Sequence, residues 1–361
     1  MRGQGGGARG TVPDAIEQLK EKVGCEWSNI DQAQKLSALT QQRLRELLRA
    51  QDPSDTSIVV FGSLARGEYT LGSDVDWTLL IDGQADEGHY GQARSIAQLL
   101  ADEAFHEPGP TGVFGNIAFS HPILHQIGGQ EDTNKITTQR ILLLLESLAI
   151  GKGEAYERVL RLVLSRYVED DRGLMYGSKS HTIPRFLLND IVRYWRTVAV
   201  DFVSKQRERS DGWALRNAKL RMSRKLIFVS GLLTCFSFEL FGAGQSWVDE
   251  HGGMATPRLV DFLLKRIRVR PMANLAEVLL RPSVSVETCK TLFDTYDAFL
   301  GLLADREKRD HLKKLPLEFL GKDPLFKEAG RMGHRFQTGL DRLFFDEDVE
   351  LGRLIRAYGV F

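Results

Sequence analysis

The sequence predicts a small mixed α/β core followed by a mostly α-helical C-terminal domain. Between residues 55 and 125, short β-branched and apolar runs alternate with a helical pattern, which indicates one small sheet with helices. From Thr137 onward, apolar residues recur at helical spacing almost throughout. A chain of 361 residues suits about two domains, each large enough to bury its own core.

The expected elements follow in chain order. Residues 1–10 are glycine-rich and are expected to form a flexible N-terminus. Residues 11–135 are expected to hold a helical lead-in and the α/β core, and residues 136–361 a helical domain with a C-terminal tail. The expected strands are Ser57–Phe61, Val75–Ile81 and Val113–Phe119, and the expected helices include Asp14–Gly24, Asn29–Ala50, Gln92–Phe105, Thr137–Ile150, Glu154–Tyr167, Ile183–Arg207, Trp213–Phe236, Pro257–Arg268, Ser285–Leu315 and Gly333–Phe345.

Charge and cysteine content disfavour several classes of protein. The 48 Lys and Arg residues balance 48 Asp and Glu residues, which argues against wholesale electrostatic binding of nucleic acid but leaves a local basic groove open. Cys25, Cys235 and Cys289 are odd in number and far apart, so neither a disulfide framework nor a zinc cluster is expected. No apolar stretch is long enough to span a bilayer and no cleavable signal is visible, so a cytoplasmic protein is expected.

The segment Phe61–Asp82, FGSLARGEYTLGSDVDWTLLID, carries the chemistry. A strand ends in Gly62 and Ser63, and glycine lets another group approach the backbone closely. A short polar turn with Arg66 follows, and then Asp74 and Asp76 open the next strand. Because side chains alternate along a strand, these two aspartates are expected on one face, with the residue between them on the other.

Two carboxylates on one face repel each other unless a hard divalent cation lies between them. Carboxylate oxygens suit Mg²⁺, with Mn²⁺ as an alternative, and magnesium sites usually include substrate phosphates. A turn with a serine hydroxyl just before such a site is well placed to hold the phosphates of a nucleoside triphosphate. The implied reaction is transfer of a nucleotidyl group. The competing interpretation, a surface pair of aspartates, leaves the preceding Gly-Ser unexplained.

Gly62-Ser63, followed eleven residues after the serine by Asp74-Val75-Asp76, resembles the motif of the DNA polymerase β-like nucleotidyltransferase superfamily. The resemblance implies an α/β nucleotidyltransferase core, catalytic and metal-binding roles for Asp74 and Asp76, and nucleotide-binding roles for Gly62, Ser63 and Arg66. It also implies a third carboxylate from a neighbouring strand, where this sequence departs from the pattern because the third expected strand carries Asn116.

Two acids lie nearest to that third position. Asp132 is favoured over Glu131, both in the segment GGQEDTN before an apolar helix. Asp132 is equally well explained as a helix-capping residue. A site with two carboxylates and water in the remaining positions is the other alternative, since Mg²⁺ keeps waters readily.

A basic helix is predicted in the segment WALRNAKLRMSRK, from Trp213 to Lys225. Arg216, Lys219 and Ser223 recur at spacings of three and four and so share one helix face. The resemblance implies that Lys219 and Ser223 hold the triphosphate, with Arg216 or Lys225 as helpers. The alternative is a basic face that is exposed to water or rests on an acidic neighbour.

The wider pattern over residues 55–235 resembles bacterial stand-alone nucleotidyltransferases and is similar to the nucleotidyltransferase of the Hailong antiphage system. That resemblance implies short (deoxy)adenosine oligonucleotides made from dATP or ATP, a membrane effector that senses the product, and priming on a tyrosine near the C-terminus, here Tyr358. Docking of the last helix explains Tyr358 equally well. An adenylyltransferase that modifies a protein or small molecule and a catalytically silent nucleotide sensor remain the alternatives.

Overall fold

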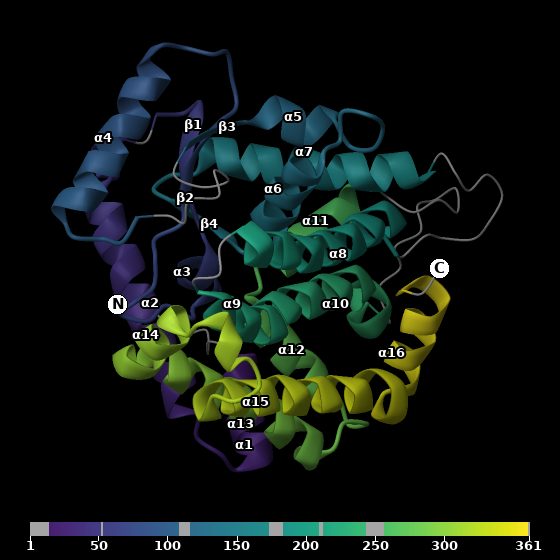
Figure 1. The fold of residues 1–361 in the computed structure, drawn as a ribbon. Helices are drawn as coiled ribbons and strands as arrows, with labels where there is room; N and C mark the ends of the chain where they lie inside the picture. The colour runs from purple at the N-terminus through teal and green to yellow at the C-terminus, as the bar shows by residue number, and fades with distance from the viewer. Residues whose placement is uncertain are drawn as a thin grey trace, which may run out of the picture.

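A four-stranded mixed sheet lies at one side of the molecule, and helices make up most of the rest (Figure 1). The computed structural model describes residues 14–51, 53–107, 116–172, 183–208, 212–242 and 256–359. The strand order is β3-β2-β1-β4; β1 is antiparallel to β2 and β4, and β2 is parallel to β3. The predicted fold class is confirmed. The strands are β1 (Thr56–Phe61), β2 (Trp77–Ile81), β3 (Asn116–Phe119) and β4 (Ser147–Ile150).

The two faces of the sheet pack into two different cores, as period-two alternation requires. Val59 and Leu80 point into the large core that the sheet shares with the helical domain. Ile58 and Leu79 point into a smaller core, which is closed by α4 and the end of α2. Asp76 precedes β2 in the same alternation as Leu80, so its carboxylate lies on the side of the sheet that faces the helical domain.

Helices account for the rest of the regular structure in the described residues. Short 3₁₀ turns lie at η1 (Arg49–Gln51) and η3 (Leu317–Phe319), and π-helical turns at η2 (Leu220–Arg224), η4 (Arg342–Glu347) and η5 (Ile355–Gly359). The α-helices are α1 (Ala15–Val23), α2 (Ser28–Leu47), α3 (Gly62–Arg66), α4 (Gly88–Asp102), α5 (Ser120–His125), α6 (Asn134–Leu145), α7 (Glu154–Arg172), α8 (Arg185–Glu208), α9 (Trp213–Lys219), α10 (Lys225–Phe241), α11 (Thr256–Ile267), α12 (Pro271–Leu279), α13 (Val286–Ala304), α14 (Arg306–Lys314), α15 (Pro324–Asp341) and α16 (Val349–Leu354).

The expected helix over Thr137–Ile150 is two elements in the structure. The helix α6 ends at Leu145, and residues 147–150 pair with β1, so that Ser147 lies opposite Phe61. An apolar run of this length is compatible with helix or strand, and the free edge of β1 decides in favour of a strand. The sheet therefore extends beyond residue 135, where the helical domain was expected to begin.

The N-terminal helices pack against the C-terminal part of the chain. The indole N–H of Trp27 donates to Asp294 of α13 at 2.8 Å. Asp297, also on α13, accepts hydrogen bonds from the backbone N–H groups of Asn29 and Ile30 at 2.9 and 3.0 Å, and so caps α2 from outside that helix. The helical domain is thus built from both ends of the chain. Within the described ranges, no helix has the length and apolar character needed to cross a membrane.

A buried ionic cluster joins α6, α7 and α8. The guanidinium of Arg140, which is fully buried, donates to Asp132 at 3.0 Å and to Asp190 at 2.8 Å. The hydroxyl of Tyr167 donates to Asp190 at 2.6 Å, and Arg193 donates to Asp132 at 3.0 Å. Burial alone would raise the pKa of the Asp132 carboxyl, but the Gly128 amide and Arg140 hold this pKa below its ordinary value.

Replacing Asp132 by Asn is expected to lower the free energy of unfolding by about 3 kcal/mol, because the buried Arg140 loses one of its two carboxylate partners and Arg193 loses its own. Urea unfolding at pH 7 measures the change. Asp346→Asn, at an exposed aspartate, serves as the matched control and should stay within about 0.5 kcal/mol of the parent. Unchanged stability in Asp132→Asn would contradict this structural role.

Candidate functional site

Asp74 and Asp76 lie in the segment that leads into β2. The Phe61 N–H donates to the backbone oxygen of Asp76 at 2.9 Å, which continues the β1–β2 pairing by one residue. Val75 is buried in the smaller core, Asp74 is exposed and Asp76 is half-buried. Neither carboxylate forms a hydrogen bond or ion pair with another described residue. Two acidic side chains therefore stand unpaired at one end of the sheet.

Gly62 makes room for Asp76. Its φ is +68°, a region that favours glycine, and a Cβ at this position would lie 2.8 Å from the Asp76 Oδ2 atom. Gly62 also begins α3, a short helix where a polar turn was expected. Ser63 follows with a half-buried side chain, and its hydroxyl makes no hydrogen bond to another described residue. Gly62 therefore lies against the Asp76 carboxylate, and the next residue carries a hydroxyl without a protein partner among the described residues.

Arg66 lies in a buried group of ion pairs. Its side chain is only 6% exposed and pairs with Glu68 at 2.8 Å and with Glu146. Burial alone would lower the pKa of this guanidinium, but the two carboxylates raise it well above its ordinary value, so the group stays charged. Both carboxylate partners of Arg66 therefore come from the protein itself.

Glu146, between α6 and β4, is an acid near Asp76 that the sequence analysis did not identify. Its side chain is fully buried and lies between Arg66 and Arg224, the latter at 3.0 Å. Burial raises the pKa of the Asp76 carboxyl; Arg224 opposes this rise, while Glu146 and Asp74 add to it. Glu146 therefore shapes the field at Asp76, yet its own oxygens are used by the arginines.

Lys219 and Arg224 reach the site from the basic helix. Both act electrostatically on Asp76, although five residues separate them. In a regular α-helix this spacing would turn the two side chains about 140° apart. The π-helical turn η2 between them widens the helix and brings the two onto a common side. The sequence indicated a basic helix, but only the π turn selects which cations face the carboxylates.

The other residues predicted on this helix have different surroundings. Ser223 is buried, and its hydroxyl donates to the backbone oxygen of Lys219 at 3.3 Å. The Lys225 ammonium donates to Gln337 of α15 at 2.7 Å. The guanidinium of Arg216 lies next to Gly212, near the start of α9. Lys219, by contrast, has electrostatic contacts to both Asp74 and Asp76.

The pKa of Lys219 is lowered from an ordinary 10.5 to about 8, chiefly by burial. The charges of Arg309 and Arg224 contribute to this lowering, and Asp74 and Asp76 offset part of it. Among the described residues the ammonium group has no ion pair or hydrogen bond. A partly buried cation without a partner is unfavourable in the protein alone, which is typical of a group that awaits an anionic ligand.

Asp132 and Tyr358 are not brought to the two carboxylates. The contacts of Asp132 are those of the buried cluster around Arg140. The residue that caps α6 is Thr133, not Asp132. Glu131, the other candidate, is exposed.

Tyr358 lies in η5, half-buried against the helical core. The preceding helix α16 packs against α10, and Arg353 pairs with Glu239 near the C-terminal end of α10. Lys219 and Arg224 lie at the other end of α10, which has 17 residues and is therefore about 25 Å long. Figure 1 shows α16 on the opposite side of the molecule from α3.

Asp74 and Asp76 supply the oxygens that a divalent cation would need. In the described part of the chain, no group of three or more His, Cys, Asp or Glu side chains is arranged to hold a metal ion. Two carboxylates are nevertheless a common protein contribution where substrate phosphates complete the shell of a magnesium ion. The chemistry of the donor set, with like charges side by side, therefore fits a divalent metal.

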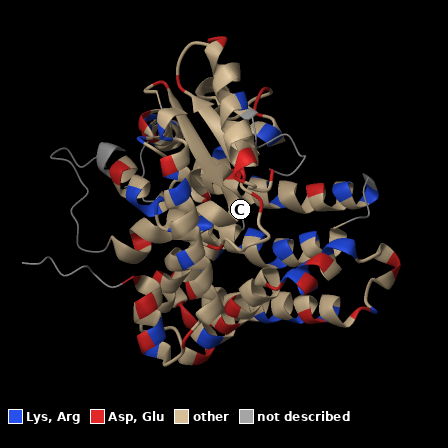
Figure 2. Cartoon of the chain, turned by 90° about the vertical axis from the view of Figure 1, so that its left-hand side faces the viewer, with Lys and Arg blue, Asp and Glu red and all other residues tan. Residues whose placement is uncertain are grey.

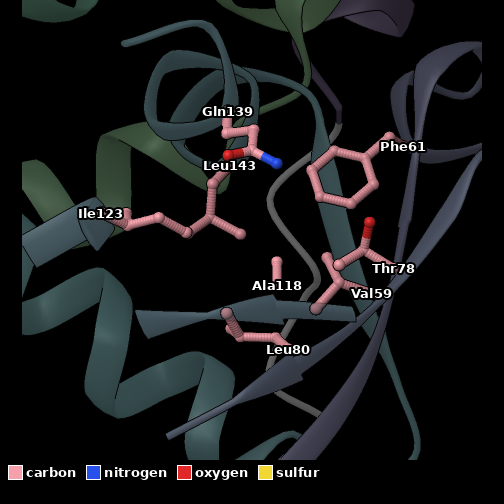
Figure 3. A pocket seen from close by; sticks show the side chains of 8 residues that line it. All are labelled: Val59, Phe61, Thr78, Leu80, Ala118, Ile123, Gln139 and Leu143. Atoms are coloured by element: carbon pink, nitrogen blue, oxygen red, sulfur yellow. The ribbon is translucent and has the colours of Figure 1, made fainter. Parts of the chain in front are cut away.

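A small apolar cavity lies beside the site. It has a volume of about 20 Å³ and is enclosed between the sheet and α5 and α6 (Figure 3). Phe61, Thr78, Ile123 and Leu143 are among its lining residues, and it has room for about one water molecule. It is too small for a nucleotide. In Figure 2 the positions of Lys and Arg and those of Asp and Glu are interspersed along the described chain, in agreement with its zero net charge.

Residues 42–108 match the family model described as "Nucleotidyltransferase domain". The matched segment runs from α2 through β1, α3 and β2 to α4, and it contains Gly62, Ser63, Asp74 and Asp76. Over this segment the chain is similar to that family, and the match supports the predicted enzyme class, nucleotidyl transfer. No curated protein matches the sequence. Lys219, Arg224 and Glu146 lie outside the matched residues.

Gly62→Ala is expected to reduce turnover by about 100-fold, because its Cβ would push the Asp76 carboxylate out of place by an ångström or so. Steady-state pyrophosphate release measures the effect. Gly24→Ala is the matched control: Gly24 has a φ of +66°, but a Cβ there would meet nothing within 4 Å. Both variants should lose similar stability from backbone strain, and only Gly62→Ala should lose activity. Equal activity in the two variants would contradict the close-approach role.

Lys219→Met is expected to stabilise the metal-free protein at pH 7 while it impairs triphosphate binding. The folded-state pKa of about 8 lies below the unfolded value, so the unfolded chain binds more protons between pH 8 and 10.5. The stability of the parent protein, relative to the variant, should therefore rise with pH across this window. Urea unfolding in EDTA at pH 7, 8.5 and 9.5 tests this. The free energy of unfolding of Lys219→Met should exceed that of the parent by on the order of 2 kcal/mol at pH 7, and the difference should shrink at higher pH. A pH-independent difference would count against the lowered pKa.

Proposed function

We propose that this protein is a Mg²⁺-dependent nucleotidyltransferase, which transfers a nucleoside monophosphate from a nucleoside triphosphate to an acceptor hydroxyl. One observation carries the proposal. Ser63, Asp74, Asp76 and Lys219 gather at one end of the sheet, and none forms a side-chain hydrogen bond or ion pair through its functional group to another described side chain. The surrounding charges of Arg66, Glu68, Glu146 and Arg224 are all paired. Unpaired groups of both signs suit a ligand that brings phosphates together with a metal.

Each residue has a distinct task in this proposal. Asp74 and Asp76 would hold the divalent ion, which neutralises the triphosphate and favours attack by the acceptor oxygen. The hydroxyl of Ser63 donates to a phosphate oxygen, and Lys219 contributes its positive charge to the phosphates. Gly62 leaves space for Asp76, and Glu146 holds Arg224 beside that carboxylate through their 3.0 Å ion pair.

The finer proposal concerns the product. The resemblance of residues 55–235 to stand-alone bacterial nucleotidyltransferases supports template-independent synthesis of short (deoxy)adenosine oligonucleotides from dATP or ATP, in antiphage defence with a membrane effector that senses the product. Transfer of a single adenylyl group to a protein or small molecule uses the same site and is the second candidate. The two differ only in the acceptor, so the products distinguish them.

Tyr358 is the proposed acceptor that starts the chain of nucleotides. In the described conformation it packs on the helical core at the far end of α10. Self-priming therefore requires the segment that follows Asp348 to leave this core, or a second copy of the protein to present its tyrosine. Intact-mass measurements after incubation with dATP and Mg²⁺ test this, with Tyr358→Phe as the control. Equal added mass in the two proteins would exclude Tyr358.

Replacing both Asp74 and Asp76 by Ala is expected to abolish pyrophosphate release, a loss of at least about 1000-fold, because the ligands for the metal are removed. The fold should remain, since neither carboxylate has a stabilising partner. Mass spectrometry of products from a mixture of all common nucleoside triphosphates identifies the nucleotide and the acceptor in the parent protein.

The matched control is Asp102→Ala combined with Asp346→Ala, two exposed aspartates away from the site. This double variant should retain the parent rate. Parent-level pyrophosphate release by the Asp74 and Asp76 variant would show that the site assignment is wrong. A ladder of oligomers supports the synthase, and label on an added target supports the adenylyltransferase.

A further inference from the structure

Arg309, on α14 in the C-terminal part of the chain, lies against the segment that carries Asp74. Its side chain is 9% exposed, and Nη1 donates to the Thr70 hydroxyl at 3.2 Å. The guanidinium lies over Gly72, where a Cβ would come within 3.2 Å of its Cζ, Nε and Nη1 atoms. Arg309 is more than two hundred positions from Asp74 in the sequence. It nevertheless contacts Gly72, which is only two residues before that proposed metal ligand.

Arg309 differs from the other buried arginines of the described chain. Arg66 and Arg140 each pair with two carboxylates. Arg309 forms no ion pair within 4 Å among the described residues, and its single hydrogen bond goes to a neutral hydroxyl. A guanidinium has five N–H donors, so most of its hydrogen-bonding capacity has no protein partner here. Burying a cation in this way is unfavourable unless an anion arrives.

Lys219 is the electrostatic neighbour of Arg309. The helices α9 and α14 pack against each other, and burial together with the charge of Arg309 lowers the pKa of Lys219. Burial also lowers the pKa of Arg309, with Asp74 offsetting part of the effect. Lys219 and Arg309, neither of which has an ion pair among the described residues, therefore both interact electrostatically with Asp74. This arrangement is suited to a polyanion that lies between the cations and a metal at the carboxylates.

We propose that Arg309 and Lys219 together bind the pyrophosphate portion of the nucleoside triphosphate. The inference rests on the proposed function and deepens it by assigning the leaving group to a cation pair drawn from two distant helices. In the reaction, the acceptor oxygen bonds to the α-phosphorus and releases its proton to water, and the bond from the α-phosphorus to the bridging oxygen breaks. The electron pair leaves with the pyrophosphate, whose growing negative charge the guanidinium and the ammonium stabilise.

Calorimetric titration of the full-length protein with inorganic tripolyphosphate in EDTA tests the site without turnover. Arg309→Gln should weaken binding by about 10- to 100-fold, because a charge-assisted contact is lost. Arg306→Gln, on the same helix at an exposed position, is the matched control and should bind as the parent does. Unchanged affinity in Arg309→Gln would overturn the proposal.

Inhibition by added pyrophosphate provides a second readout in the presence of Mg²⁺ and substrate. The inhibition constant should rise in Arg309→Gln by a factor similar to the loss of tripolyphosphate affinity. If Arg309 only held the segment of Asp74 in place, turnover would fall while the inhibition constant stayed the same, which would contradict the proposal. Arg309→Lys keeps the charge, so its inhibition constant should lie between those of the parent and Arg309→Gln. If urea unfolding shows that Arg309→Gln does not fold, Arg309→Lys takes its place in both measurements.

The two proposals fail in different ways. Tripolyphosphate binding that depends on Arg309, in a protein that releases no pyrophosphate from any nucleoside triphosphate, would preserve the anion site and remove the proposed function. Pyrophosphate release that is insensitive to Arg309 in every assay would preserve the function and remove the anion site.

Discussion

The carboxylate of Glu146, held between Arg66 and Arg224, is the interaction on which the site depends. It is fully buried, and it joins three parts of the chain: the short helix after β1, the junction of α6 with β4, and the π turn that precedes α10. Charges in such surroundings are stable only when they are paired, because their hydration is lost. The pairing therefore fixes the helical domain against the end of the sheet, and it sets Arg224 beside Asp76.

A contrast between paired and unpaired charges distinguishes structural from candidate functional residues. The cluster of Asp132, Arg140, Asp190 and Tyr167 satisfies its polar groups internally, as a buried cluster that stabilises a fold should. At the end of the sheet, the pKa of Asp76 is raised and that of Lys219 is lowered, and both changes favour the neutral form of the side chain. Neither group has a partner within hydrogen-bonding distance among the described residues. The protein bears this unfavourable arrangement where a metal and phosphates would relieve it.

Local sequence was sufficient for some features and insufficient for others. The β-branched run of β1, the Gly-Ser pair and the spaced aspartates follow from strand alternation and the conformational freedom of glycine, both of which act within a few residues. The strand β4 could not be distinguished from the end of a helix, because its identity comes from pairing with β1. The sequence did not indicate a role for Glu146, because a glutamate at the end of a helix is common. Its role comes from Arg66 and Arg224, which other parts of the chain place around it.

The α/β core followed by helices could be predicted from the sequence, and so could the segment that places two carboxylates after a Gly-Ser turn. Those properties depend on residues close together in the chain. The charges that meet that segment could not be predicted in this way, because they come from the packing of distant helices. The π turn selects Lys219 and Arg224 from a run of cations, and packing of α14 on α9 adds Arg309 from the C-terminal part of the chain. Electrostatic contacts act through space, so the partners of a charge are set by how helices pack and not by their order in the sequence.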